Sequence, residues 1–137
     1  MAQKKLLVQD YMTRRLTTLS PETEIMAAVQ TLLEKDVSGA PVLDGNGGLL
    51  GILTHKDCMK VVLNAAYHSE FYGVVADFMT TNPQVLSPDC SIVEAAQQFL
   101  DQSYHRYPVV ADGTMVGLIS RRDILTALED AWQWQND

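Results

Sequence analysis

The segment that decides the fold runs from Gly51 to Asp57 and reads Gly-Ile-Leu-Thr-His-Lys-Asp. A second copy runs from Gly117 to Asp123 and reads Gly-Leu-Ile-Ser-Arg-Arg-Asp. In each copy an apolar run leads to a hydroxyl residue, and a carboxylate follows three positions later. This pattern is typical of a strand that passes directly into a capped helix. Two such copies predict an internal repeat, which determines the organisation of the whole chain.

The residues around this segment repeat in the same order, at a nearly constant offset. The offset becomes one residue shorter between Pro108 and Gly117, and we place the deletion in a turn because turns accept changes of length. We predict repeats at 8–62 and 75–128, a partly helical and packed connecting segment at 63–74, and a C-terminal tail at 129–137. The other repeated motifs are Asp10-Tyr11-Met12-Thr13 with Asp77-Phe78-Met79-Thr80, Leu19-Ser20-Pro21 with Leu86-Ser87-Pro88, and Pro41-Val42 with Pro108-Val109.

Each copy is predicted to have the order strand, helix, strand, strand, helix. Ser20-Pro21 and Ser87-Pro88 are expected to open the first helices, because serine caps free amide groups and proline fits the first helical position. The expected strands cover 17–19, 40–43 and 49–53, then 84–86, 107–111 and 115–119, and the last helices start near Thr54 and Ser120. The expected apolar helix faces are Ile25, Val29, Leu32 and Leu33 in one copy and Ile92, Ala96, Phe99 and Leu100 in the other.

The predicted fold class is α/β (α+β), with two pseudo-twofold-related β-α-β-β-α repeats packed through their sheets. One copy alone is too small to bury a sufficient core, so the two copies are expected to share one. A cleft would then run between equivalent edges of the repeats. The length of 137 residues and the hydrophobic content of 47% suit this arrangement.

Charge and apolar patterning exclude several classes of function. The chain has 10 Lys and Arg against 17 Asp and Glu, which gives a formal charge of −7. Such a chain does not attract a nucleic-acid duplex, although a local basic pocket for one small anion remains allowed. Apolar runs fall well short of the roughly 20 residues that span a bilayer. The segment before Gln9 and Asp10 is too polar for a signal peptide. We therefore expect a cytoplasmic protein without membrane insertion.

No catalytic or metal-binding arrangement stands out. Cys58 and Cys90 do not have the spacing of a disulfide scaffold or a zinc site, and the histidines lack metal-ligand spacing. No nucleophile, base and orienting residue form a familiar set. We expect a protein that is not an enzyme, holds no metal and requires no cofactor.

Two interpretations of the repeated Thr54–Asp57 and Ser120–Asp123 motif stay open. In the first, the hydroxyl caps a helix and the acid lies near the positive end of the helix dipole. In the second, the helix N-terminus receives a phosphate while the carboxylate accepts hydrogen bonds from ribose hydroxyls.

These paired motifs resemble a tandem CBS-domain pair, or Bateman module, of the stand-alone bacterial type. The resemblance covers nearly the whole chain. The segments Val37–Val42 and His105–Val110 are also similar to the adenine-site and phosphate-site segments of the γ subunit of AMP-activated protein kinase. The resemblance implies that an adenosine compound (AMP, ADP, ATP or S-adenosylmethionine) binds in the cleft between the repeats.

The resemblance also implies two sites, each built from both repeats, and leaves open which halves pair. Site one would use Asp57 for ribose and Thr54 for phosphate or sugar, with Thr81, Asn82, Tyr104, His105 and Arg106 from the second repeat. Site two would use Asp123 and Ser120, with Arg14, Arg15, Val37, Ser38 and Gly39 from the first. The basic residues that follow the hydroxyls are either phosphate contacts or solvated surface charges: His55, Lys56, Arg121 and Arg122.

The two implied sites differ in charge. His105 and Arg106 put cationic donors beside site one, where site two has Ser38 and Gly39. Because arginine binds phosphate through paired donors, site one is expected to favour the more highly phosphorylated ligand. Glycine at position 39 also leaves room beside a flat base.

The function that we predict is a regulatory, energy-sensing module that binds adenosine nucleotides and modulates an unknown protein partner. A homodimer with four repeats in a disc is expected from the resemblance. The alternative is a pure protein-interaction or dimerisation module with vestigial clefts. Trp132 and Trp134, in the expected tail, either pack back on the module or contribute to a partner surface.

Overall fold

The computed structural model describes residues 6–136 and has the mixed α+β composition that the sequence predicts. Most of the segment weighed above as a signal peptide, residues 1–5, lies outside the described residues. In chain order the elements are the 3-10 turn η1 (Val8–Asp10), α1 (Ile25–Glu34), β1 (Gly39–Leu43), β2 (Leu49–Thr54), α2 (His55–His68), α3 (Val75–Phe78), β3 (Thr80–Thr81), α4 (Ile92–Asp101), β4 (Arg106–Ala111), β5 (Thr114–Ser120) and α5 (Arg121–Asn136).

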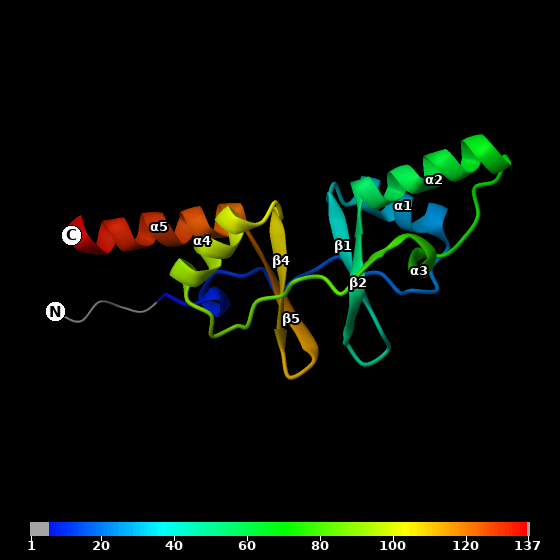
Figure 1. The fold of residues 1–137 in the computed structure, drawn as a ribbon. Helices are drawn as coiled ribbons and strands as arrows, with labels where there is room; N and C mark the ends of the chain where they lie inside the picture. The colour runs from blue at the N-terminus through cyan, green and yellow to red at the C-terminus, as the bar shows by residue number, and fades with distance from the viewer. Residues whose placement is uncertain (1–5, 137) are drawn as a thin grey trace. The chain divides into compact units, whose positions relative to one another are not determined.

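The chain forms two compact units, each with its own hairpin and helices (Figure 1). Unit 1 comprises Met1–Leu16 and Gln84–Asp137, and unit 2 comprises Thr17–Pro83. These units do not coincide with the sequence repeats. The start of the first repeat packs with the second repeat, and the start of the second repeat packs with the first.

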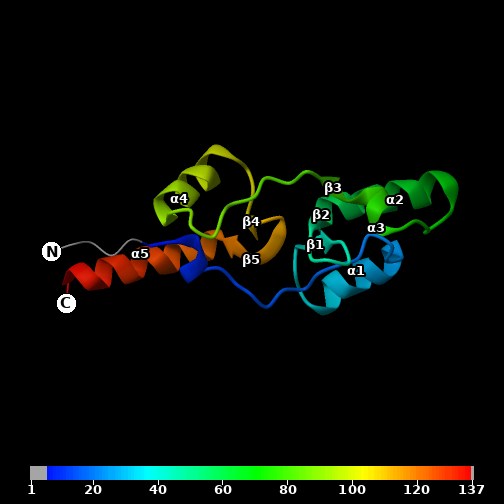
Figure 2. The ribbon, with the colours of Figure 1, turned by 90° about the horizontal axis from the view of Figure 1, so that it is seen from below.

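This exchange involves two lead-in segments, residues 6–13 and 73–80. In Figure 2, η1 lies beside the helices of unit 1 and α3 beside those of unit 2. The backbone hydrogen bonds of the two lead-in segments match one to one, in agreement with the Asp-x-Met-Thr motif near the start of both repeats. The matched N···O pairs are Val8–Cys90 at 2.8 Å with Val75–Thr23 at 2.9 Å, and Ile92–Leu6 at 3.0 Å with Ile25–Gly73 at 2.9 Å.

Each unit contains one antiparallel hairpin joined to its lead-in segment. In unit 2 the strand order is β1-β2-β3. In unit 1 β4 pairs with β5, and Thr13 forms an antiparallel bridge with Leu118 of β5. The β4–β5 turn is Asp112-Gly113, with positive φ at both residues, so the deleted residue does lie in a turn. The strands expected at 17–19 and 84–86 contribute single parallel bridges, Leu19 with Val42 and Leu86 with Val109.

The expected helix openings at Ser20-Pro21 and Ser87-Pro88 are wrong. Both dipeptides form turns, in which Thr23 N lies 3.1 Å from Ser20 O and Cys90 N lies 3.0 Å from Ser87 O. The helices begin one turn later, because Glu24 and Ser91 provide the side-chain caps of α1 and α4.

The predicted apolar faces of α1 and α4 are partly wrong as well. Leu33 and Leu100 are exposed, whereas the alanines Ala28 and Ala95 are fully buried. Ala28 and Ala95 thus belong to the buried faces of these helices, and Leu33 and Leu100 to the exposed faces. The core of unit 2 is mostly aliphatic and includes Leu53, whereas that of unit 1 includes the aromatic residues Phe99 and Tyr107.

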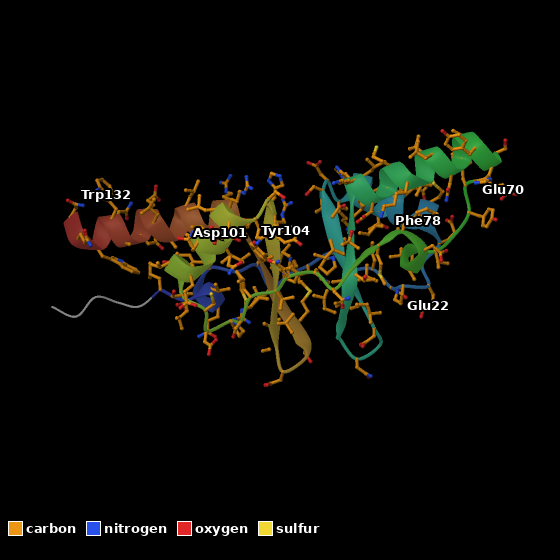
Figure 3. All side chains as sticks on the ribbon, viewed as in Figure 1. Glu22, Glu70, Phe78, Asp101, Tyr104 and Trp132 are labelled. Carbon is orange, nitrogen blue, oxygen red and sulfur yellow. The ribbon has the colours of Figure 1, made fainter. Side chains whose placement is uncertain are left out.

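The connecting segment and the tail also differ from expectation. Residues 63–68 are helical as predicted, but the expected packing is wrong, because Tyr67, Phe71 and Tyr72 are 81%, 63% and 70% exposed. The tail is helical, since α5 continues to Asn136. Trp132 therefore lies near the end of this helix, largely exposed (Figure 3).

Candidate functional site

The repeated motif forms the junction between a hairpin strand and the helix that follows it. In unit 2, β2 ends at Thr54 and α2 begins at the next residue. Asp57 N donates to Thr54 Oγ1 at 3.2 Å, and Thr54 N donates to Asp57 Oδ2 at 2.9 Å. These reciprocal bonds form a capping box, which satisfies two amide groups at the helix start. The helix-cap interpretation of Thr54 is thus confirmed, and a cap does not by itself exclude a ligand.

The carboxylate of Asp57 is buried, with 4% of the residue exposed. Beyond the capping bond, its Oδ1 accepts from Thr80 Oγ1 at 2.8 Å and from Lys60 Nζ at 3.2 Å. Thr54 Oγ1 donates a further bond to Oδ2 at 3.0 Å. Burial works to raise the pKa of Asp57, but the hydrogen bonds from Thr54, Thr80 and Lys60 outweigh burial and lower the pKa below its ordinary value of 3.8. Asp57 is therefore held as an ionised, fully bonded group.

The second copy of the motif has the same backbone geometry but a more open carboxylate. Ser120 N donates to Asp123 Oδ2 at 2.8 Å, and Asp123 N donates to Ser120 Oγ at 3.2 Å. Within the described residues, the Oδ1 oxygen of Asp123 accepts no hydrogen bond. Asp123 is half-buried in the first turn of α5, so its carboxyl group is less enclosed than that of the buried Asp57.

The glycine that opens each motif allows a lead-in segment to lie against the hairpin. A Cβ on Gly51 would come within 2.5 Å of Thr80 O, and one on Gly117 within 2.5 Å of Met12 Sδ. These contacts would require a shift in the neighbouring chain. The motif glycines thus position the strand that carries Thr80 in unit 2 and the bridge at Thr13 in unit 1.

In unit 1 four predicted basic residues, His105, Arg106, Arg121 and Arg122, lie close to Ser120, although the resemblance implies His105 and Arg106 for site one. Arg106 lies opposite Ser120 in the β4–β5 pairing, and Arg121 N donates to His105 O at 3.3 Å. Arg14 and Arg15 follow Thr13, and the antiparallel direction of its bridge carries them away from Ser120 along β5. Every arginine of the chain belongs to unit 1, together with the half-exposed Tyr104.

In unit 2 the other predicted residues lie near Thr54. Gly39 is opposite Thr54, and its Cβ position would be 3.1 Å from Leu53 O, so close strand pairing accounts for this glycine. His55 Nε2 lies 3.0 Å from Val37 O, and the amide of His55 donates to Ser38 O. Lys56 is exposed.

The exchange of lead-in segments also assigns the remaining predicted residues. Thr81 lies opposite Gly51, and Asn82 follows it with a φ of 50°. Although both belong to the second sequence repeat, they share unit 2 with Asp57. The Tyr104–Arg106 segment was predicted for the same site as Asp57 but belongs to unit 1. Likewise, Val37–Gly39 was predicted for the same site as Asp123 but belongs to unit 2.

Sequence reasoning missed two residues of the Asp57 cluster, Lys60 and Thr80. Lys60 was detectable, because it follows Asp57 by three positions on a helix and such pairs lie side by side. Thr80 was not detectable in this way, because in the sequence it is only the end of a repeated motif. Its bond to Asp57 depends on a contact between residues 23 positions apart.

Over residues 6–136, no helix is both long and apolar enough to cross a membrane. In the same part of the chain, no three His, Cys, Asp or Glu side chains come together in a way that could hold a metal ion.

The geometry and the repeated motif agree with the comparisons to known proteins. The CBS domain matches residues 8–64 and 75–130, and the chain therefore belongs to the CBS domain family and carries two such domains. The uncharacterized protein MJ1225 of Methanocaldococcus jannaschii is 27% identical over 129 residues, covering 94% of this chain and 45% of MJ1225. The chloroplastic CBS domain-containing protein CBSX2 of Arabidopsis thaliana is 30% identical over 148 residues, covering 88% of this chain and 62% of CBSX2.

A solved structure extends the likeness to three dimensions. The crystal structure of CBSX2 in complex with AMP has a TM-score of 0.81 and 32% identity to this chain, and it covers 91% of this chain and 97% of that one. The chain spans less than two thirds of the full length of the two curated relatives above.

Proposed function

We propose that this chain is a regulatory module that binds an adenosine-containing molecule, with AMP as the first ligand to test. The open carboxylate of Asp123 at the start of α5 is the observation that carries the proposal. Membership in the CBS domain family and the AMP complex of CBSX2 support it. The module is proposed to have no catalytic activity, to act in the cytoplasm and to modulate a protein partner.

The residues of unit 1 suit the two ends of a nucleotide. The unbonded Oδ1 of Asp123 can accept a hydrogen bond from a ribose hydroxyl, because an ionised carboxylate only accepts. The hydroxyl of Ser120, directly before α5, suits a phosphate oxygen because a hydroxyl can donate a hydrogen bond to it. The two arginines of α5 add positive charge, which a chain with a net charge of −7 needs locally to hold an anion.

The family resemblance implies two sites for the nucleotide, and the bonding observed at Asp123 supports site two. Site two uses Asp123 and Ser120, and site one uses Asp57 and Thr54. Competition of AMP, ADP and ATP for these sites would make the module a sensor of cellular energy. The contributing residues are proposed to be Arg14, Arg15, Val37, Ser38 and Gly39 for site two and Thr81, Asn82, Tyr104, His105 and Arg106 for site one, with His55, Lys56, Arg121 and Arg122 toward the phosphates.

Isothermal titration calorimetry with AMP, ADP, ATP, adenosine and S-adenosylmethionine tests the proposal. Asp123→Ala should weaken AMP binding by about 1–3 kcal/mol, the scale of a hydrogen bond to a charged group. Glu129→Ala is the matched control, because it removes an exposed acid of the same helix without touching the motif. Failure of the wild-type protein to bind any of these ligands would overturn the proposed function.

A second proposed property is homodimerisation through α2 and α5. Both helices expose large apolar side chains at equivalent positions, since Met59 and Leu125 are 56% and 64% exposed and Val62 and Leu128 are 59% and 64% exposed. Such a face is usually covered in an assembly. The self-association of identical chains would cover such exposed apolar side chains.

Light scattering after size-exclusion chromatography tests the dimer. The wild-type chain should elute as a dimer, and Leu128→Asp should shift it toward the monomer because a carboxylate cannot be buried without a partner. Glu129→Ala again serves as the control, because Glu129 is exposed and directly follows Leu128 in α5 but carries no apolar side chain. A monomeric wild-type protein would rule out this assembly.

A further inference from the structure

The Asp57 carboxylate has no acceptor capacity left for a ligand. An ionised carboxylate offers about four lone-pair positions to donors. At Asp57 four donor bonds are formed, two from Thr54 to Oδ2 and one each from Lys60 and Thr80 to Oδ1. A ribose that approached this carboxylate would have to displace a protein donor for every hydroxyl that it brought. Each new hydrogen bond from ribose would replace a hydrogen bond from the protein, so the net gain in binding free energy would be small.

The Asp123 carboxylate keeps most of its acceptor capacity. Only Ser120 N donates to it among the residues that the structure describes. The absence of a lysine bond at Asp123 has a cause in the sequence, since the position that corresponds to Lys60 is occupied by Thr126. The Thr126 hydroxyl donates to Arg122 O at 3.2 Å in its own helix and so does not reach the acid.

Lys60 is also held in place from a second side. Its ammonium donates to Phe78 O at 3.3 Å in addition to Asp57 at 3.2 Å, so it ties α2 to the end of α3. Thr80, two residues further on, reaches the same Oδ1. The lead-in segment of unit 2 therefore brings both the carbonyl that orients Lys60 and the second donor to Asp57.

We propose that Lys60 is a specificity-determining residue that occupies the Asp57 carboxylate in place of ribose, leaving Asp123 as the one carboxylate of this chain that binds adenosine compounds. This inference rests on the proposed function and deepens it. It assigns the two repeats different roles: the motif of unit 1 binds the ligand, and the motif of unit 2 is a closed, structural copy. The neutral, short Thr126 keeps the unit 1 motif open.

Exchanging the two residues between the repeats tests the inference. Calorimetric titration with AMP should give one site per wild-type chain. Lys60→Thr, which copies the residue of the other repeat, should give a second site. A double variant with Thr80→Ala removes both donors to Oδ1 and covers the case in which Thr80 alone still blocks the carboxylate. Conversely, Thr126→Lys should weaken binding by more than about tenfold, the scale of one hydrogen bond to a charged group.

Lys35→Thr is the control, because it removes an exposed lysine of unit 2 away from the motif. It should leave one site with unchanged affinity, and circular dichroism should show that all variants keep the fold. Two equal sites in the wild-type chain would overturn the inference, as would a single site in both Lys60 variants or full affinity in Thr126→Lys. If the wild type and every variant bound none of AMP, ADP, ATP, adenosine and S-adenosylmethionine, the proposed function would instead be overturned, and the inference with it.

Discussion

The two units have the same backbone hydrogen bonds but different side-chain hydrogen bonds around their motifs. Each hairpin receives a lead-in segment through matched bonds, and each motif begins a helix with the same reciprocal cap. At the motif acid, however, unit 2 adds Lys60 and Thr80 as donors, whereas unit 1 adds none among the described residues. The comparison teaches that the repeat conserves the scaffold and that its chemistry is set by a few side chains beside it.

The cores differ in the same way, and the largest predicted effect follows from this difference. Tyr107 in β4 is 1% exposed, its ring meets Phe99 edge-on at 4.8 Å, and its hydroxyl donates to Gln98 O at 3.0 Å. The equivalent position in β1 is Ala40. Tyr107→Ala should therefore lower the free energy of unfolding by about 3–5 kcal/mol, because unit 1 cannot refill a cavity of this size.

Urea denaturation measures this loss. Tyr107→Phe is the control, since it keeps the ring and removes only the hydroxyl, which should cost about 1 kcal/mol. If the alanine variant lost no more stability than the phenylalanine variant, the central role of the ring in unit 1 would be refuted.

The motif glycines provide a sharper test of the exchanged segments. In Gly51→Ala the new methyl group would lie 2.5 Å from the backbone oxygen of Thr80, whereas in Gly117→Ala it would first meet the flexible end of Met12 at the same distance. Backbone yields less readily than a methionine side chain. We expect the free energy of unfolding to fall by about 3 kcal/mol in Gly51→Ala and by about 1 kcal/mol in Gly117→Ala. These values are the upper and lower ends of the usual cost of overpacking a core.

The measurement is again the free energy of unfolding, with both variants in one series. The two alanine variants control for each other, because the substitution and the sequence motif are the same. A larger loss in Gly117→Ala than in Gly51→Ala would show that the lead-in segments are not packed as described.

The repeat, the hairpins and the caps at Thr54 and Ser120 could be predicted because each is a local pattern. A hydroxyl at the end of an apolar strand, with an acid three residues later, has few other stable arrangements. The prediction that helices open at Ser20 and Ser87 was wrong, and the reason is also local. A Ser-Pro pair suits a turn as well as a helix start, and Glu24 and Ser91 offered competing caps a few residues later.

The exchange of lead-in segments could not be predicted, because both repeats begin with the same motif. Because the motif occurs twice, its presence alone does not tell which hairpin each segment joins. The state of the Asp57 carboxylate depends on that pairing, since Thr80 reaches it only through the exchange. The candidate acids were therefore identifiable from the sequence, but the difference between them was not.

The smallest expected effect is a difference in acid stability that comes from Asp57. Hydrogen bonds from Thr54, Thr80 and Lys60 outweigh burial and lower the pKa of Asp57 in the folded chain below its ordinary value of 3.8. A carboxyl group with a lowered folded-state pKa stabilises the fold above its unfolded-state pKa, and the contribution is lost as pH falls through the folded-state pKa. Asp57→Asn cannot titrate, so it should lose this part of the stability at neutral pH and show a flatter decline of stability on the acid side of pH 4.

Lys60→Thr should fall between the wild type and Asp57→Asn, because it removes one of the donors that lower the pKa and leaves the others in place. Urea denaturation at a series of pH values from neutral to acid measures all three curves. Thr126→Lys is the counterpart in unit 1 and should not alter the part of the profile that Asp57 produces, since Thr126 and Asp57 belong to different units. If the acid limbs of wild type, Lys60→Thr and Asp57→Asn coincided, the four bonds at Asp57 would not distinguish the ionised from the protonated group, and the contrast between the two motif acids would have to rest on ligand binding alone.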